Sequence, residues 1–127
     1  MCDPRIAADA TVGADVTFGI GVVVESRAVL GDGVSLGNHV TVHAGTTFGP
    51  GVSVGDFAVV GRSPKLAASS TASRAPLEPL RVGVGTSIGS HTVVAAGTTI
   101  GANCVIADGA GVRERCTIGD DVVVGRN

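Results

Sequence analysis

The sequence predicts an all-β solenoid built from six-residue units, and three observations support this prediction. A branched aliphatic residue or Phe recurs at every sixth position, from Ile6 to Val60 and again from Val82 to Val124, without a polar exception. A period of six fits neither a helix nor a long alternating strand, but it fits a short strand followed by a corner. The only aromatic residues of the Phe, Trp and Tyr group are three Phe among 127 residues, which suits a core of small repeated layers.

Within each unit, the residue types predict the corner and the interior. If the aliphatic residue is position one, position two is mostly Gly, and position four is mostly Gly, Asn or Asp. These three residues tolerate a positive φ, so position four is the predicted corner. Position five is small, and we expect positions one and five to point inward and positions six and two outward. Cys104 and Cys116 fall on position five, where we interpret them as small core residues in a reducing compartment.

The family resemblance of the chain rests on its six-residue units, such as Leu36-Gly-Asn-His-Val-Thr41 and Ile100-Gly-Ala-Asn-Cys-Val105. Through them the chain resembles the hexapeptide-repeat proteins, whose fold is a left-handed parallel β-helix. The resemblance covers nearly the whole chain and implies three units per coil, hence three flat faces. We therefore expect one domain over residues 1–127, a left-handed parallel β-helix of about six coils.

The pattern itself supports three faces. If Ile6, Val24, Val42 and Val60 start the first face, the six-residue repeat returns to that face at residues 94 and 112. Most departures from Gly at position two lie on this face: Ala7, Glu25, His43, Ala95 and Arg113, with Ala107 as the exception. A random phase would scatter such departures over all three faces.

The first face is also the one whose outward residues are apolar in the middle coils. Position six there holds Val23, Val59 and Val93, among others. An outward apolar stripe usually marks a contact, which here would be with another copy of the chain. The alternative is that valine occurs there only because it suits a strand.

One segment, residues 62–81, interrupts the period. It contains three prolines, so we predict a loop that leaves the corner between the first and second faces. Its cations are Arg62, Lys65, Arg74 and Arg81 against Glu78, a net charge of +3 in a chain of net charge −2. A long loop in a tight solenoid is commonly functional, and we expect these four cations to bind phosphate groups of a thioester cofactor or of a nucleotide sugar. A solvated excursion is the alternative.

The candidate catalytic residues are His43 and Glu25, which occupy position two of the first face on successive coils. Stacked coils lie ~4.8 Å apart, so the two side chains could meet. A carboxylate beside an imidazole orients it and raises its basicity, which suits a general base. The alternative is a structural pair at a subunit contact.

The other two histidines, His39 and His91, share one corner column with Phe57 between them. We expect a stack of three rings along this edge. A part in an acceptor pocket is the alternative.

The resemblance implies an acyltransferase that takes acetyl-CoA or another acyl-CoA as co-substrate. It also implies a homotrimer with active sites between subunits, and a small acceptor whose amine or hydroxyl is acylated, such as a nucleotide-linked amino sugar. A non-catalytic scaffold or trimerisation module remains an alternative. A zinc carbonic anhydrase of the same fold needs three converging His, but the places of two of them hold Asn38 and Ala7, so no metal is expected.

Composition and motifs argue against several other classes. The net charge of −2 gives no bulk support for nucleic-acid binding, and no apolar run reaches membrane-spanning length. No secretory leader is visible, and we expect a cytoplasmic protein. The many Gly-x-Gly strings come from the repeat and indicate no nucleotide fingerprint. The sequence stops at Asn127 inside a unit, which leaves open that it is a fragment lacking C-terminal coils.

Overall fold

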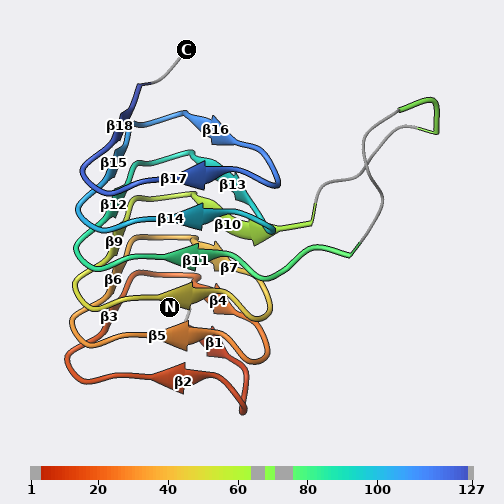
Figure 1. The fold of residues 1–127 in the computed structure, drawn as a ribbon. Helices are drawn as coiled ribbons and strands as arrows, with labels where there is room; N and C mark the ends of the chain where they lie inside the picture. Colours follow the sequence, from red (N-terminus) through yellow and green to blue (C-terminus); the bar gives the residue numbers. More distant parts are fainter. Residues whose placement is uncertain (1–3, 64–67, 71–75, 126–127) are drawn as a thin grey trace.

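The computed structural model of the chain describes residues 4–63, 68–70 and 76–125, and within these ranges it contains strands and no helix. Eighteen short strands form three parallel sheets of six strands each, stacked into a three-sided solenoid (Figure 1). Sheet A, the first face, consists of β1 (Arg5–Ile6), β4 (Val23–Val24), β7 (Thr41–Val42), β10 (Val59–Arg62), β13 (Val93–Ala95) and β16 (Gly111–Val112). No helix long and apolar enough to cross a membrane occurs in the described ranges.

The other two faces follow the same order along the chain. Sheet B consists of β2 (Thr11–Val12), β5 (Val29–Leu30), β8 (Thr47–Phe48), β11 (Arg81–Val82), β14 (Thr99–Ile100) and β17 (Thr117–Ile118). Sheet C consists of β3 (Thr17–Phe18), β6 (Ser35–Leu36), β9 (Ser53–Val54), β12 (Ser87–Ile88), β15 (Val105–Ile106) and β18 (Val123–Val124). The predicted strands, faces and number of coils are thus confirmed.

The register places equivalent residues of successive coils directly above one another. Val24 pairs with Val42, and Val42 with Val60, so each column of the repeat is a vertical row of side chains. With the first coil at the bottom of Figure 1, the strands of sheet B cross the near side from right to left as the coils rise. This direction makes the coil left-handed, as the family resemblance implies.

The corners lie at position four of the repeat, as its Gly, Asn and Asp residues predict. From Asp15 to Asp121, position four of each regular unit has a φ between +56° and +79°. Most of these residues are Gly, Asn or Asp, which adopt this conformation at little cost. The exceptions are Arg27, His39, Phe57, His91 and Arg115.

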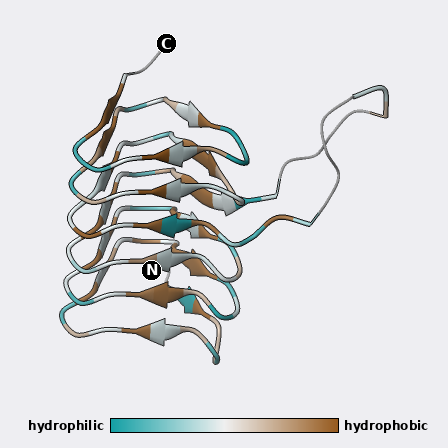
Figure 2. Ribbon diagram, viewed as in Figure 1, coloured by the Kyte–Doolittle hydropathy of each residue, from teal (hydrophilic) through white to brown (hydrophobic). Residues whose placement is uncertain are grey.

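The core consists of the inward residues at positions one and five. In the middle coils they are almost fully buried, as Leu30, Phe48 and Ile88 show with 1% exposure each, whereas Ile6 and Val12 in the first coil are 38% and 39% exposed. Figure 2 shows the hydrophobic residues along the strands and more hydrophilic residues at the corners. Cys104 is buried and Cys116 is half-buried, both as free thiols, whereas Cys2 lies outside the described residues.

Four buried threonines stand at position five among these apolar side chains. In three of them the hydroxyl donates to a carbonyl of the next coil: Thr86 to Gly101 at 2.7 Å, Thr92 to Ala107 at 3.3 Å and Thr98 to Arg113 at 2.7 Å. The fourth, Thr46, has no hydrogen-bond partner in the described part of the chain.

The regular coil is interrupted between β10 and β11, where the chain leaves the edge shared by sheets A and B (Figure 1). We call residues 62–79 the arm. The chain rejoins the stack at Glu78, whose carbonyl accepts from Gly97 N at 2.6 Å, just as the Ser26 carbonyl accepts from Gly45 N at 3.0 Å two coils below. Leu80 then takes a fully buried place at position five. The coils above and below the arm therefore keep their register.

Candidate active site beneath the arm

The candidate site begins with position two of sheet A, where Gly is replaced by larger residues on two successive coils. Because Val24 pairs with Val42, Glu25 and His43 project from adjacent strand ends, β4 and β7. His43 Nδ1 lies 3.1 Å from Glu25 Oε1. The contact expected from the sequence is present.

The chemistry of the pair sets which nitrogen of His43 is free. An ionised carboxylate has only acceptors, so Nδ1–H is the donor to Glu25 and Nε2 keeps its lone pair. The Glu25 carboxylate is itself oriented, because its Oε1 also accepts from Ala44 N at 3.2 Å. The side chains of His43 and Glu25 are 31% and 43% exposed, so a small molecule can reach the pair.

A cleft of about 530 Å³ lies over this pair, bounded on one side by the arm. It is lined by Glu25, Arg27, His43, Ala44, Gly61, Arg62, Ser63, Leu77, Pro79 and Ala96. Such a volume suits a small ligand or one end of a larger one. The carboxylate of Glu25, the imidazole of His43 and the guanidinium of Arg62 therefore line the same cleft.

Two corner glycines hold the returning limb of the arm. A Cβ added to Gly45 would lie 2.9 Å from Pro79 Cγ, and one added to Gly97 would lie 2.7 Å from Leu77 Cδ2. Both glycines have a positive φ, +75° and +79°. The arm thus packs where the corners below and above it carry no side chain.

The outgoing limb starts at a bulge centred on Gly61. Here the register shifts, so that Val60 pairs with Val94 but Arg62 pairs with Ala95. Gly61 is buried with a φ of +83°, and a Cβ added to it would collide with the hydroxyl of Thr46. In the regular coils that hydroxyl donates to the residue 15 positions on, which for Thr46 is Gly61. The bulge therefore accounts for the unpaired hydroxyl of Thr46.

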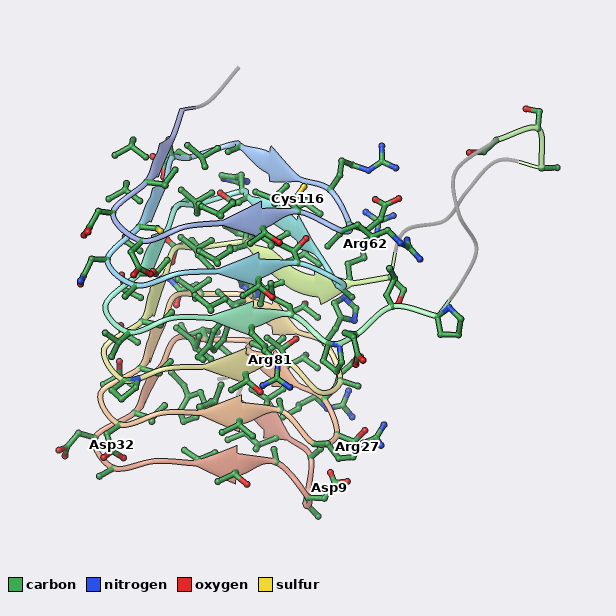
Figure 3. All side chains as sticks on the ribbon, in the orientation of Figure 1. Asp9, Arg27, Asp32, Arg62, Arg81 and Cys116 are labelled. Atoms are coloured by element: carbon green, nitrogen blue, oxygen red, sulfur yellow. The ribbon has the colours of Figure 1, made fainter. Side chains whose placement is uncertain are left out.

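The four predicted phosphate-binding cations are only partly covered by the described residues. Arg62 lines the cleft, whereas Arg81 projects from the start of β11 on sheet B and is not among the lining residues. Figure 3 shows Arg27 and Arg62 at the arm side of the solenoid, Arg81 on the near face and Asp32 at the opposite edge. Lys65 and Arg74 lie outside the described residues. The structure thus brings one predicted cation, Arg62, to the predicted base.

The column that holds Glu25 and His43, position two of sheet A, ends with Arg113, one coil above Ala95. Its Nε donates to Glu114 Oε1 at 3.0 Å, and this hydrogen bond lowers the pKa of the Glu114 carboxyl. In the described part of the chain, no group of three His, Cys, Asp or Glu side chains is placed to hold a metal ion.

The corner between sheets C and A carries a second unusual feature, the stacked rings of His39, Phe57 and His91, which we call the aromatic ladder. Neighbouring ring centres lie 5.2 Å apart with interplanar angles of 16° and 11°. The predicted stack is confirmed, and Phe57 is 51% exposed within it.

Sequence reasoning did not find several residues of the cleft. Gly61 reads as an ordinary position-two glycine, because only its φ and the register shift show the bulge. Arg27 looks like a solvated corner residue, yet it lines the cleft. Pro79 carried a weak signal, since counting back from Val82 places it at position four, the corner of the repeat, whereas nothing in the sequence marked Leu77.

Comparisons with known proteins agree with the fold. The chain is similar to LpxA from Acinetobacter baumannii, with 22% identity and a TM-score of 0.84 over 94% of this chain and 48% of that one. It is also similar to LpxA from Bacteroides fragilis, a UDP-N-acetylglucosamine acyltransferase, with 21% identity and a TM-score of 0.86 over 96% and 49% of the two chains. The chain thus spans about half the length of these solved structures. No curated protein sequence matches it.

Family models give the assignment. The model described as the hexapeptide repeat of succinyl-transferase matches residues 5–50 and 80–102, and that of the bacterial transferase hexapeptide matches residues 97–127. Together the two matches leave out residues 51–79, which include the arm, and cover repeats before and after this stretch. The chain therefore belongs to the hexapeptide-repeat transferase family.

Proposed function

We propose that this chain transfers an acyl group from an acyl-CoA thioester to the amine or hydroxyl of a small acceptor. One observation carries the proposal: the His43–Glu25 pair stands in the cleft beneath the arm, with Nε2 of His43 free to accept a proton. Membership of a transferase family and the similarity to acyltransferases of the same fold support this reading.

In the proposed reaction, His43 acts as general base. The acceptor nitrogen or oxygen attacks the thioester carbonyl carbon while Nε2 of His43 takes the proton from the acceptor. The carbon–sulfur bond then breaks, and the imidazolium returns the proton to the leaving thiolate. Glu25 stabilises the charged imidazole and keeps its ring oriented.

The cations of the arm are proposed to bind the phosphates of the nucleotide part of the co-substrate. Arg62 stands in the cleft, and its planar guanidinium suits a two-pronged contact with phosphate. Lys65, Arg74 and Arg81 complete this proposed set. As the acceptor we propose a small molecule of the nucleotide-linked amino sugar class, and as the assembly a homotrimer formed through sheet A.

A thiol-release assay with acetyl-CoA and a panel of amino-sugar and amine acceptors tests the proposal. The protein should release CoA only when an acceptor is present, and His43→Ala should lower the rate by ~10²–10⁴-fold because the general base is lost. His39→Ala, which removes an exposed histidine from the other corner of sheet A, is the matched control and should keep the rate.

The Glu25→Gln variant separates the two roles. It should lose less activity than His43→Ala, because it disturbs the orientation of the imidazole and leaves the base in place. If His43→Ala turns over as fast as the unaltered protein, the pair is structural. If no acceptor in the panel supports thiol release and acetyl-CoA does not bind, the scaffold alternative becomes the better description.

A further inference from the structure

The aromatic ladder occupies positions where the fold does not favour aromatic residues. His39, Phe57 and His91 have φ values of +56°, +62° and +58°, a conformation that bulky residues rarely adopt. In the same column, Gly21 and Gly109 occupy the coils below and above. Bulky residues held in this conformation on successive coils suggest a use for their rings.

The rings lean toward the preceding coil, as the lower end of the ladder shows. The imidazole of His39 stands in the place where a side chain of Gly21 would begin. The Nδ1 and Cε1 atoms of His39 therefore lie close to Gly21 of the coil below. Phe57 stacks on His39, and His91 stacks on Phe57.

The upper end of the ladder is different. A side chain at residue 109 would lean onto the upper face of His91 in the same way, but Gly109 has none. The level directly above the His91 ring, which a side chain of residue 109 would fill, is therefore left empty by Gly109, and His91 itself is exposed.

A carboxylate stands at the side of this empty level. Asp108 precedes Gly109 and also leans toward the coil below, where its Oδ1 accepts from Ser90 N at 2.8 Å. Ser90 precedes His91, so this carboxylate lies beside the level at which a further ring would stack. A carboxylate can accept about four hydrogen bonds, and the bond from Ser90 leaves capacity for a donor on the rim of a ligand.

From these observations we infer that the upper end of the aromatic ladder binds a nucleobase. A base would stack on His91 in the place that Gly109 leaves empty, and an N–H on its rim would donate to Asp108. Stacking of a base on an aromatic side chain tolerates several bases, so adenine and uracil both fit this chemistry. The inference concerns the corner between sheets C and A and does not depend on the proposed acyl transfer.

Proton NMR of the histidine rings, with adenosine and uridine as probes, tests this inference. The chain has three histidines, so its three imidazole Cε1–H signals can be assigned with His39→Asn, His43→Asn and His91→Asn. A nucleoside should shift the His91 signal upfield and saturably through the ring current, and should leave the His43 signal in place. Tighter binding of adenosine would point to the base of a CoA-type donor, and tighter binding of uridine to a uridine-linked acceptor.

Two variants with matched controls complete the test. Gly109→Asn should fill the empty level and weaken nucleoside binding by about tenfold or more, since stacking of a base is worth that much. Asn103 already adopts a φ of +57° at another corner, so the substitution suits the backbone. Gly33→Asn, at the corner between sheets B and C with a φ of +72°, should leave binding unchanged. In the same titrations His39→Asn should keep binding. The His91→Asn variant has no His91 signal, so its loss of binding is followed by the line widths of the nucleoside's own protons.

The contact with Asp108 is tested by N6,N6-dimethyladenosine, which has no exocyclic N–H and should bind more weakly than adenosine. Equal affinities would remove Asp108 from the site. An unmoved His91 signal with both nucleosides up to their solubility limit would overturn the inference. So would equal binding by the Gly109→Asn and Gly33→Asn variants. Because no thioester is present in these titrations, their outcome is independent of the acyl-transfer assay.

Discussion

The edge between sheets B and C and the two edges of sheet A use the same backbone turn with different residues. Every described corner of the B–C edge is a residue that tolerates a positive φ: Asp15, Gly33, Gly51, Gly85, Asn103 and Asp121. The edges of sheet A add Arg27, Arg115 and the aromatic ladder at closely similar φ values. An ordinary residue in this conformation costs about 1–2 kcal/mol, so the sheet A edges are less stable than the fold allows.

The outward residues of the sheets also set sheet A apart. Outward positions in the middle of sheet A carry valine, at residues 23, 59 and 93, whereas those of sheet C carry serine at residues 35, 53 and 87. The arm and the His43–Glu25 pair also belong to sheet A. The B–C edge therefore shows what the solenoid needs to fold, and the sheet A side shows what the chain adds to it.

The largest effect that would separate the two sides is a change of assembly. Val59→Asp should place an unpaired charge in the proposed contact between copies, at a cost of about 3–5 kcal/mol, and should convert a trimer into monomers. Light scattering measures the mass directly. Val105→Asp, an outward valine of sheet C, is the control and should keep the trimer. A monomeric unaltered protein would remove the proposed contact altogether.

A medium effect is expected at the start of the arm. Gly61→Ala should lower the free energy of unfolding by about 2–3 kcal/mol, because the new Cβ meets the Thr46 hydroxyl in a conformation that already disfavours Ala. Gly33→Ala at the B–C edge has a φ of +72° but its nearest neighbour is 3.9 Å away, so it should cost only about 1 kcal/mol. Urea unfolding of both variants gives the comparison. Equal losses would show that the bulge is no tighter than an ordinary corner.

The smallest effect concerns two buried threonines of one column. Thr46→Val should raise the free energy of unfolding by up to about 1 kcal/mol, because it removes a buried hydroxyl that has no partner among the described residues. Thr98→Val should lower it by about 1 kcal/mol, because it removes the 2.7 Å bond to the Arg113 carbonyl. The same unfolding experiment measures both. A loss of stability in both variants would mean that the hydroxyl of Thr46 is satisfied in solution.

The regular part of the molecule was predictable because each column repeats one physical requirement. Inward positions need apolar volume and corners need a positive φ, so the register of Val42 or the turn at Asn103 follows from the period. The contact between Glu25 and His43 also followed, since side chains one coil apart in a column must lie close together. Even the ring stack needed only the column position of Phe57.

The remainder of the site could not be read from the period because the arm has none. The bulge at Gly61 depends on how the chain leaves the stack, and nothing in a Gly at position two distinguishes it from its regular counterparts. The seating of Pro79 against Gly45 likewise depends on contacts between segments far apart in the period. Lys65 and Arg74 lie outside the described residues, so their proposed role stays a prediction.

The re-entry of the chain at Glu78 has a consequence for engineering. Because β8 and β14 pair with β11 in the same register as any other coil, the register of the stack does not depend on the length of the segment between Arg62 and Leu77. Closing a loop twice as long costs only about 0.6 kcal/mol more. The arm is thus a natural grafting point, at which a foreign peptide or a small domain could be displayed from a rigid three-sided rod.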